Sequence, residues 1–111
     1  TAHYFMADLA RELGGLPLLV VVRALLGTIN HTLLTLYYAR REGTEVLGIV
    51  MNHTSPQQGL AESLNREALY RWGEVPFLGS LPFLPNPDPE SIKRAIKVNL
   101  DVTSIGTLLR R

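Results

Sequence analysis

The feature that most constrains the fold is a strand-like run followed by a helix start, within residues 16–35 (LPLLVVVRALLGTINHTLLT). Residues 18–22 are apolar at every position and rich in β-branched side chains, which is typical of a strand covered on both faces in a parallel sheet. Thr28 is predicted to be the N-cap of the next helix, because its hydroxyl could accept a hydrogen bond from a first-turn amide. A strand that leads through Gly27 into a helix N-terminus is a candidate anion site, for phosphate or carboxylate.

The rest of the chain continues this alternation of strands and helices. Apolar spacing and glycine stops predict strands at 17–23, 46–51 and 75–78, and helices at 1–13, 29–42, 58–72, 88–98 and 102–109. The first two strands lie roughly thirty residues apart, the size of a βαβ unit, and right-handed crossovers make the sheet parallel. We therefore predict an α/β fold, with a parallel sheet between two layers of helices.

Three strands that are apolar on both faces need helices on two sides, and a three-stranded sheet leaves two exposed edges. Little chain remains here to cover them. The sequence is therefore interpreted as the second half of a doubly wound domain whose first half is absent from residues 1–111.

Composition and charge exclude several classes of protein. The chain has 111 residues, of which 46% are hydrophobic and 19% charged, as expected for one globular domain. The net charge is only +1 and no basic stripe is present, which argues against nucleic-acid binding. The absence of cysteine excludes disulfides and favours a reducing compartment such as the cytoplasm. No apolar run is long enough to cross a bilayer.

Ligands of open α/β sheets bind beyond the carboxyl ends of the strands, where three segments of this chain are expected. Gly27 to His31 could be an anion cradle to which Asn30 adds a side-chain amide, or an ordinary helix start. Asn52 could cap its own loop, or recognise a heterocycle that offers both a donor and an acceptor, such as adenine. The proline-rich loop after the third strand could wall a flat ligand beside Phe83, or be a rigid connector.

No catalytic residue is assigned in this chain. The histidines, His3, His31 and His53, fall in three different segments without metal-ligand spacing, so no metal site is predicted. The sequence contains no GxxxxGK[ST] motif and no strand-to-helix nucleophile elbow.

The string LGTINHTLLT at residues 26–35 closely resembles the dethiobiotin synthetases. The segments LGIVMN at 47–52 and VPFLGSLP at 75–82 resemble the family's next two strands, and the similarity covers nearly the whole chain. Cobyrinic acid amidases share parts of this pattern but lack the Asn-His-Thr-Leu-Leu-Thr helix start. The resemblance implies a fold of the P-loop NTPase type, of which residues 1–111 would be the C-terminal portion.

The resemblance also implies an activity. Dethiobiotin synthetases are ATP-dependent, Mg²⁺-dependent ligases of biotin biosynthesis that form the ureido ring of dethiobiotin from diaminopelargonic acid and CO₂. The family's P-loop lysine, Mg²⁺ ligands and other catalytic lysine belong to its N-terminal half and have no counterpart here. This chain alone is therefore expected to be inactive, and its expected partners are that missing P-loop half and a second copy in a homodimer.

The site residues implied by the resemblance form two groups. The helix start would hold the carboxylate tail of the substrate across the homodimer interface, through Gly27, Thr28, Ile29 and Asn30. The nucleotide would be bound by Asn52, whose amide would read the adenine edge, and by Pro82 and Phe83, which would flank the ring. Asp88 would be the acidic residue near the ribose. The alternatives are a non-catalytic binding or regulatory module of the same fold, and a related P-loop amidoligase with another substrate.

Overall fold

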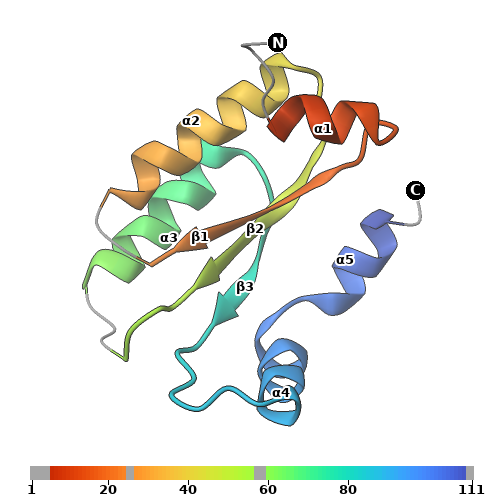
Figure 1. The fold of residues 1–111 in the computed structure, drawn as a ribbon. Helices are drawn as coiled ribbons and strands as arrows, with labels where there is room; N and C mark the ends of the chain where they lie inside the picture. Colours follow the sequence, from red (N-terminus) through yellow and green to blue (C-terminus); the bar gives the residue numbers. More distant parts are fainter. Residues whose placement is uncertain (1–5, 25–26, 57–59, 110–111) are drawn as a thin grey trace.

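The fold is a parallel three-stranded sheet with flanking helices, as a computed structural model shows for residues 6–24, 27–56 and 60–109 (Figure 1). The strand order in the sheet is β1-β2-β3. The elements in chain order are α1 (Met6–Glu12), β1 (Leu18–Arg23), α2 (Thr28–Arg41), β2 (Val46–Asn52), α3 (Leu60–Gly73), β3 (Phe77–Leu81), α4 (Pro89–Asn99) and α5 (Val102–Leu109). The predicted α/β architecture is thus confirmed. Residues 1–5 of the first predicted helix lie outside the described residues.

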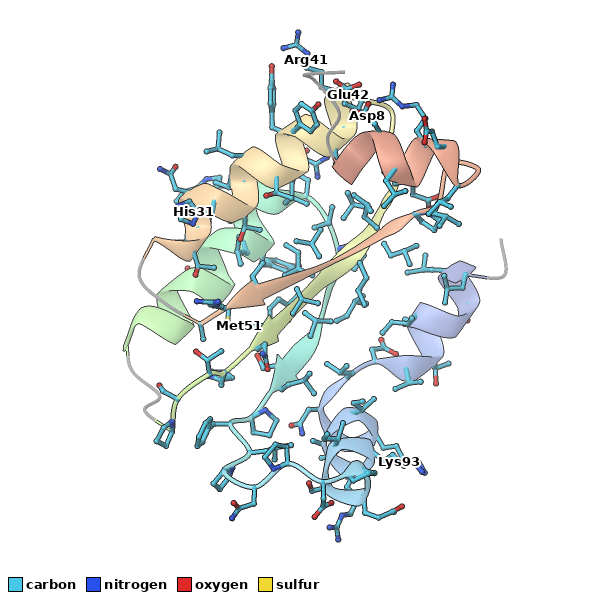
Figure 2. All side chains as sticks on the ribbon, viewed as in Figure 1. Asp8, His31, Arg41, Glu42, Met51 and Lys93 are labelled. Atoms are coloured by element: carbon cyan, nitrogen blue, oxygen red, sulfur yellow. The ribbon has the colours of Figure 1, made fainter. Side chains whose placement is uncertain are left out.

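Helices lie on both sides of the sheet (Figure 1). Helices α2 and α3 cover one face, while α4 and α5 lie against β3 on the other side (Figure 1). The core under α2 and α3 is an apolar cluster that joins both helices to the sheet, formed by Val22, Leu36, Ile49, Met51 and Leu69. In Figure 2, Met51 lies near the end of β2, where the core approaches the carboxyl edge of the sheet.

Strand β3 begins and ends later than the predicted 75–78. Pro76 lacks an N–H, but its carbonyl accepts a hydrogen bond from the Ile49 amide at 2.9 Å, so pairing with β2 starts there. The strand then continues through Gly79, whose positive φ of 136° accompanies a shift in register. The predicted end at residue 78 was wrong, because a glycine can carry an irregularity within a strand.

The buried face of α2 also differs from the predicted one. The spacing of apolar residues predicts one buried face with Ile29, Leu33, Leu36, Tyr37 and, in part, Leu34. The buried side chains are instead those of Thr28, Thr32, Leu36 and Ala39, and Tyr37 is exposed. Small side chains on the inner face let the helix lie close to the sheet, so the larger tyrosine ring points outward.

The two edges of the sheet differ. The chain after α4 covers the edge of β3 through an antiparallel bridge between Gly79 and Leu100 and a 2.8 Å hydrogen bond from the Asp101 amide to the Leu78 carbonyl. Among the described residues, no strand pairs with the outer edge of β1. No helix within the described ranges is long and apolar enough to cross a membrane.

Candidate functional site

The carboxyl ends of the three parallel strands meet at one edge of the sheet. The Ala24 amide, just after β1, donates to the Asn52 carbonyl at 3.2 Å, and the His53 amide donates to the Leu81 carbonyl at 3.1 Å. These two bonds hold the segments that follow each strand beside one another. The segments that directly follow β1, β2 and β3 therefore lie along one edge.

The N-cap of α2 is Gly27, with φ 87° and no side-chain cap hydrogen bond, so the prediction of Thr28 as the N-cap was wrong. Thr28 is buried, and its hydroxyl donates to the Arg23 carbonyl at 2.6 Å. The hydroxyl therefore ties the helix to the end of β1 instead of capping it. Gly27 has no side chain to accept from the first-turn amides, and a helix start of this kind favours an anion.

Ile29 is half-buried and Asn30 is exposed, so the amide side chain of Asn30 is open to a ligand. A groove of about 440 Å³ runs alongside, between β1 and α2. Its walls are Val20, Val21, Val22, Arg23, Thr28, His31, Thr32 and Thr35. Thr28 therefore borders the groove, whereas Gly27, Ile29 and Asn30 are not among its lining residues. Figure 2 shows His31 on the first turns of α2.

A second hollow, of about 450 Å³, lies beyond the ends of β2 and β3. Its lining combines the end of β2, the proline-rich loop and one face of α4: Asn52, His53, Thr54, Leu81, Pro82, Phe83, Leu84, Pro87, Ile92, Ala95 and Ile96. The structure thus brings Asn52, Pro82 and Phe83 together, as the sequence predicted. The volume is within the range of small-molecule sites, roughly 300–1,000 Å³.

Asp88 is not among the residues that line this hollow. It is the N-cap of α4, where its Oδ1 accepts from the Ser91 amide at 2.7 Å and its own amide donates to Ser91 Oγ at 3.1 Å. These hydrogen bonds from Ser91 lower the pKa of the Asp88 carboxyl. One carboxylate oxygen is therefore engaged in holding the helix start.

Eight of the eleven lining residues were not predicted individually from the sequence. His53 is buried directly after Asn52, and Ile92, Ala95 and Ile96 project from α4. The helical spacing of Ile92, Ala95 and Ile96 indicates a common face, but nothing in the spacing indicates that this face meets the loop after β3. No group of three or more His, Cys, Asp or Glu side chains that could hold a metal occurs in the part of the chain that the structure describes.

The parallel sheet with flanking helices defines an α/β class of fold, and comparison with known families agrees. A family model described as "AAA domain" matches residues 1–91, and the chain belongs to this family. A parallel sheet with flanking helices is consistent with a domain of the P-loop NTPase type.

The curated relatives that this chain resembles are dethiobiotin synthetases. The ATP-dependent dethiobiotin synthetase BioD of Bacillus licheniformis is 44% identical over 102 residues, which cover 92% of this chain and 43% of that protein. The proteins of the same name from Bacillus velezensis and Thermodesulfovibrio yellowstonii are 40% and 37% identical, over 96% and 95% of this chain and 45% and 44% of their own lengths. The resemblance predicted from the sequence is confirmed. The chain spans less than half the length of the curated relatives it matches.

Proposed function

We propose that this chain is the adenine- and substrate-binding portion of an ATP-dependent dethiobiotin synthetase. The complete protein would be a ligase that forms the ureido ring of dethiobiotin from diaminopelargonic acid, CO₂ and ATP. The names of the relatives and their similarity over 92–96% of this chain support the proposal. Mg²⁺ and the phosphate-binding lysine would come with the P-loop half, so residues 1–111 alone would not turn over substrate.

The observation that carries the proposal is the carboxamide of Asn52 in a hollow with largely apolar walls. A carboxamide offers an acceptor oxygen and a donor nitrogen, which match the N7 and N6 pair of adenine. Pro82 and Phe83 line the same hollow and would flank the two faces of the ring. Asp88 would contribute near the ribose through the carboxylate oxygen that Ser91 does not bind.

The helix start of α2 is proposed to bind the carboxylate tail of the substrate. The amides of Thr28, Ile29 and Asn30 follow Gly27, an N-cap without a side-chain hydrogen bond, and the positive end of the helix dipole favours an anion there. A charge-assisted hydrogen bond from such a group is worth about 1.5–3 kcal/mol. The site would be completed across a homodimer interface by a second copy.

The test is a nucleotide-preference assay on the natural gene product that contains residues 1–111. Asn52→Ala is expected to weaken the preference for ATP over GTP by about tenfold or more, because a bidentate contact to adenine is worth roughly 1–3 kcal/mol of discrimination. Asn30→Ala is expected to raise KM for diaminopelargonic acid without changing KM for ATP.

Asn86→Ala is the matched control, because Asn86 is exposed on the same loop region and does not line the hollow. An unchanged ATP preference in Asn52→Ala would refute the adenine assignment. ATP binding without dethiobiotin formation by the natural gene product would favour a non-catalytic binding module. Ring closure on a different substrate would favour a related amidoligase.

A further inference from the structure

His53 is a buried titratable residue to which the proposed function gives no role. It is only 6% exposed, whereas His31, on the first turns of α2, is exposed. His53 follows Asn52 directly in the chain and lines the same hollow beyond the ends of β2 and β3. Burying the polar atoms of an imidazole is costly unless they have hydrogen-bond partners. A buried histidine on the wall of a ligand hollow is therefore a candidate contact for the ligand.

The polar side chains of the hollow come from three consecutive residues at the end of β2. Among the described residues that line it, these are Asn52, His53 and Thr54, and the other lining residues are apolar. Thr54 is exposed, Asn52 is half-buried and His53 is buried. This order of exposure places Thr54 toward solvent and His53 toward the interior.

Hydrogen bonds of the backbone fix the position of these side chains. The Asn52 carbonyl accepts from the Ala24 amide at 3.2 Å, and the His53 amide donates to the Leu81 carbonyl at 3.1 Å. The end of β2 is thus bonded to the ends of both neighbouring strands. Side chains on such a fixed backbone are positioned before a ligand arrives, which lowers the entropic cost of binding.

Helix α4 forms an apolar wall of the same hollow. It lies beside the loop that follows β3 (Figure 1) and contributes Ile92, Ala95 and Ile96. These side chains offer a flat ligand an apolar surface and no hydrogen-bonding group. A base held against this wall would therefore take its side-chain hydrogen bonds from the end of β2.

An adenine in this hollow has a ring acceptor that the Asn52 carboxamide would not bind. Asn52 is proposed to pair with N6 and N7. The sugar is attached at N9 and must lead toward solvent, so the end of the base farthest from N9 enters most deeply. N1 lies at that end, beside the amino group, whereas N3 lies near the sugar. A buried imidazole next to Asn52 is therefore on the side that N1 would occupy.

We propose that His53 is a specificity-determining residue of the nucleotide site, and that its imidazole donates a hydrogen bond to adenine N1. The inference rests on the proposed function, in which Asn52 reads the N6 and N7 edge. Because an imidazole has two ring nitrogens, a contact of one with the protein leaves the second for the base. In an apolar hollow, a base without this acceptor would leave a buried donor unpaired, which makes the contact selective.

The first test measures nucleotide binding to the natural gene product that contains residues 1–111. The ligands are ATP and three analogues in which C–H replaces one ring nitrogen. The Kd of 1-deaza-ATP, which lacks N1, is expected to be about fivefold or more above that of ATP. The ligand control is 3-deaza-ATP, which should bind nearly as tightly as ATP. Equal Kd values for ATP and 1-deaza-ATP would overturn the proposal.

The second test changes the side chain. His53→Phe keeps a flat ring and removes both nitrogens, so ATP and 1-deaza-ATP are expected to bind it equally well. His53→Gln keeps a donor and should recover part of the preference for ATP. A merely structural role would weaken all the nucleotides by the same factor, and unchanged Kd ratios in His53→Phe would overturn the proposal. If His53→Phe does not fold, His53→Gln and the analogue series on the unsubstituted protein decide.

Asn52→Ala is the reciprocal variant, read out with 7-deaza-ATP. It should abolish the discrimination against 7-deaza-ATP and keep the discrimination against 1-deaza-ATP. Loss of the N7 effect in Asn52→Ala without any effect of His53 on N1 would refute only the role of His53. An N1 effect that depends on His53, in a protein that does not discriminate against 7-deaza-ATP, would uphold His53 and refute only the Asn52 assignment. Absence of ATP binding would refute both.

Discussion

At the scale of single residues, the sequence predicted Thr28 as the N-cap of α2, but the N-cap in the structure is Gly27. Threonine is a good N-cap, but its side chain can also bond a nearby carbonyl, and local sequence does not decide between these partners. Burial of Thr28 against β1 directs the hydroxyl to the Arg23 carbonyl, so the cap position falls to the left-handed Gly27. Thr28 thus joins α2 to β1, and Gly27 adds no side-chain cap at the N-terminus of the helix.

Replacing Gly27 with alanine is expected to destabilise the protein by about 1 kcal/mol. A Cβ there meets no atom within 4 Å, so the cost comes only from the left-handed backbone (φ 87°). Gly106→Ala is the matched control, because a Cβ in the middle of α5 also meets nothing within 4 Å and alanine favours the helix. Denaturant unfolding should show opposite signs for the two changes, and equal effects would contradict this explanation.

At the scale of elements, α4 and α5 begin with the same type of N-terminal cap, an aspartate followed three residues later by a serine. Asp88 and Asp101 each accept a hydrogen bond from the amide of a serine three residues later, Ser91 at 2.7 Å and Ser104 at 3.0 Å. Hydrogen bonds from these serines lower the pKa of both carboxyls. The two helices therefore depend on ionised caps, and α4 forms one wall of the candidate nucleotide hollow.

Low pH is expected to destabilise the N-termini of α4 and α5. A carboxyl whose pKa is lowered in the folded state adds stability above its unfolded pKa, about 3.9, and this contribution is lost as the pH falls through the lower folded value. The Tm of Asp88→Asn should therefore fall less steeply than that of the unsubstituted protein between pH 5 and pH 2. Asparagine keeps a capping side chain but removes the titrating carboxyl. If the Tm of Asp88→Asn fell with pH as steeply as that of the unsubstituted protein, a role for this carboxylate would be contradicted.

At the scale of the whole molecule, position in the fold separates residues that look equivalent in the sequence. Leu13 and Leu36 both fit apolar helical stripes, yet Leu13 is 59% exposed and Leu36 only 1% exposed. Leu36 belongs to the cluster that joins α2 and α3 to the sheet. The spacing of apolar residues indicates a face, but the neighbouring elements decide whether that face is covered.

Leu36→Ala is expected to cost about 2–5 kcal/mol of unfolding free energy, because it leaves a cavity in a close-packed cluster. Leu13→Ala, the matched control, should change the unfolding free energy by less than about 0.5 kcal/mol. Urea unfolding of the two variants measures the difference. Similar losses in both variants would contradict this explanation.

In the proposed homodimer, an exposed face of α2 would be part of the interface. Asn30, Leu34 and Tyr37 share one face of the helix at spacings of four and three, and all three are exposed. Tyr37→Glu in the natural gene product is expected to shift sedimentation toward the monomer and raise KM for the diamine. Tyr70→Glu on α3, an equally exposed tyrosine, is the control, and dissociation by both variants would place the contact elsewhere.

The sequence by itself determined the alternation of helices and strands, the parallel sheet and the family. These follow from local periodicity, from glycine stops and from a motif that needs no knowledge of the neighbouring elements. The family resemblance implied one nucleotide site with Asn52, Pro82 and Phe83, and parallel strands are expected to end at the same edge. Their convergence on one hollow agrees with this rule.

Only the tertiary structure decided which faces are buried, which group caps α2 and which side chains complete the hollow. Ile92, Ala95 and Ile96 join the site because α4 folds back against β3, and the closed edge of β3 depends on the same return of the chain. These are contacts between residues distant in sequence. They depend on side-chain volume and on the angle between elements, which no local pattern encodes.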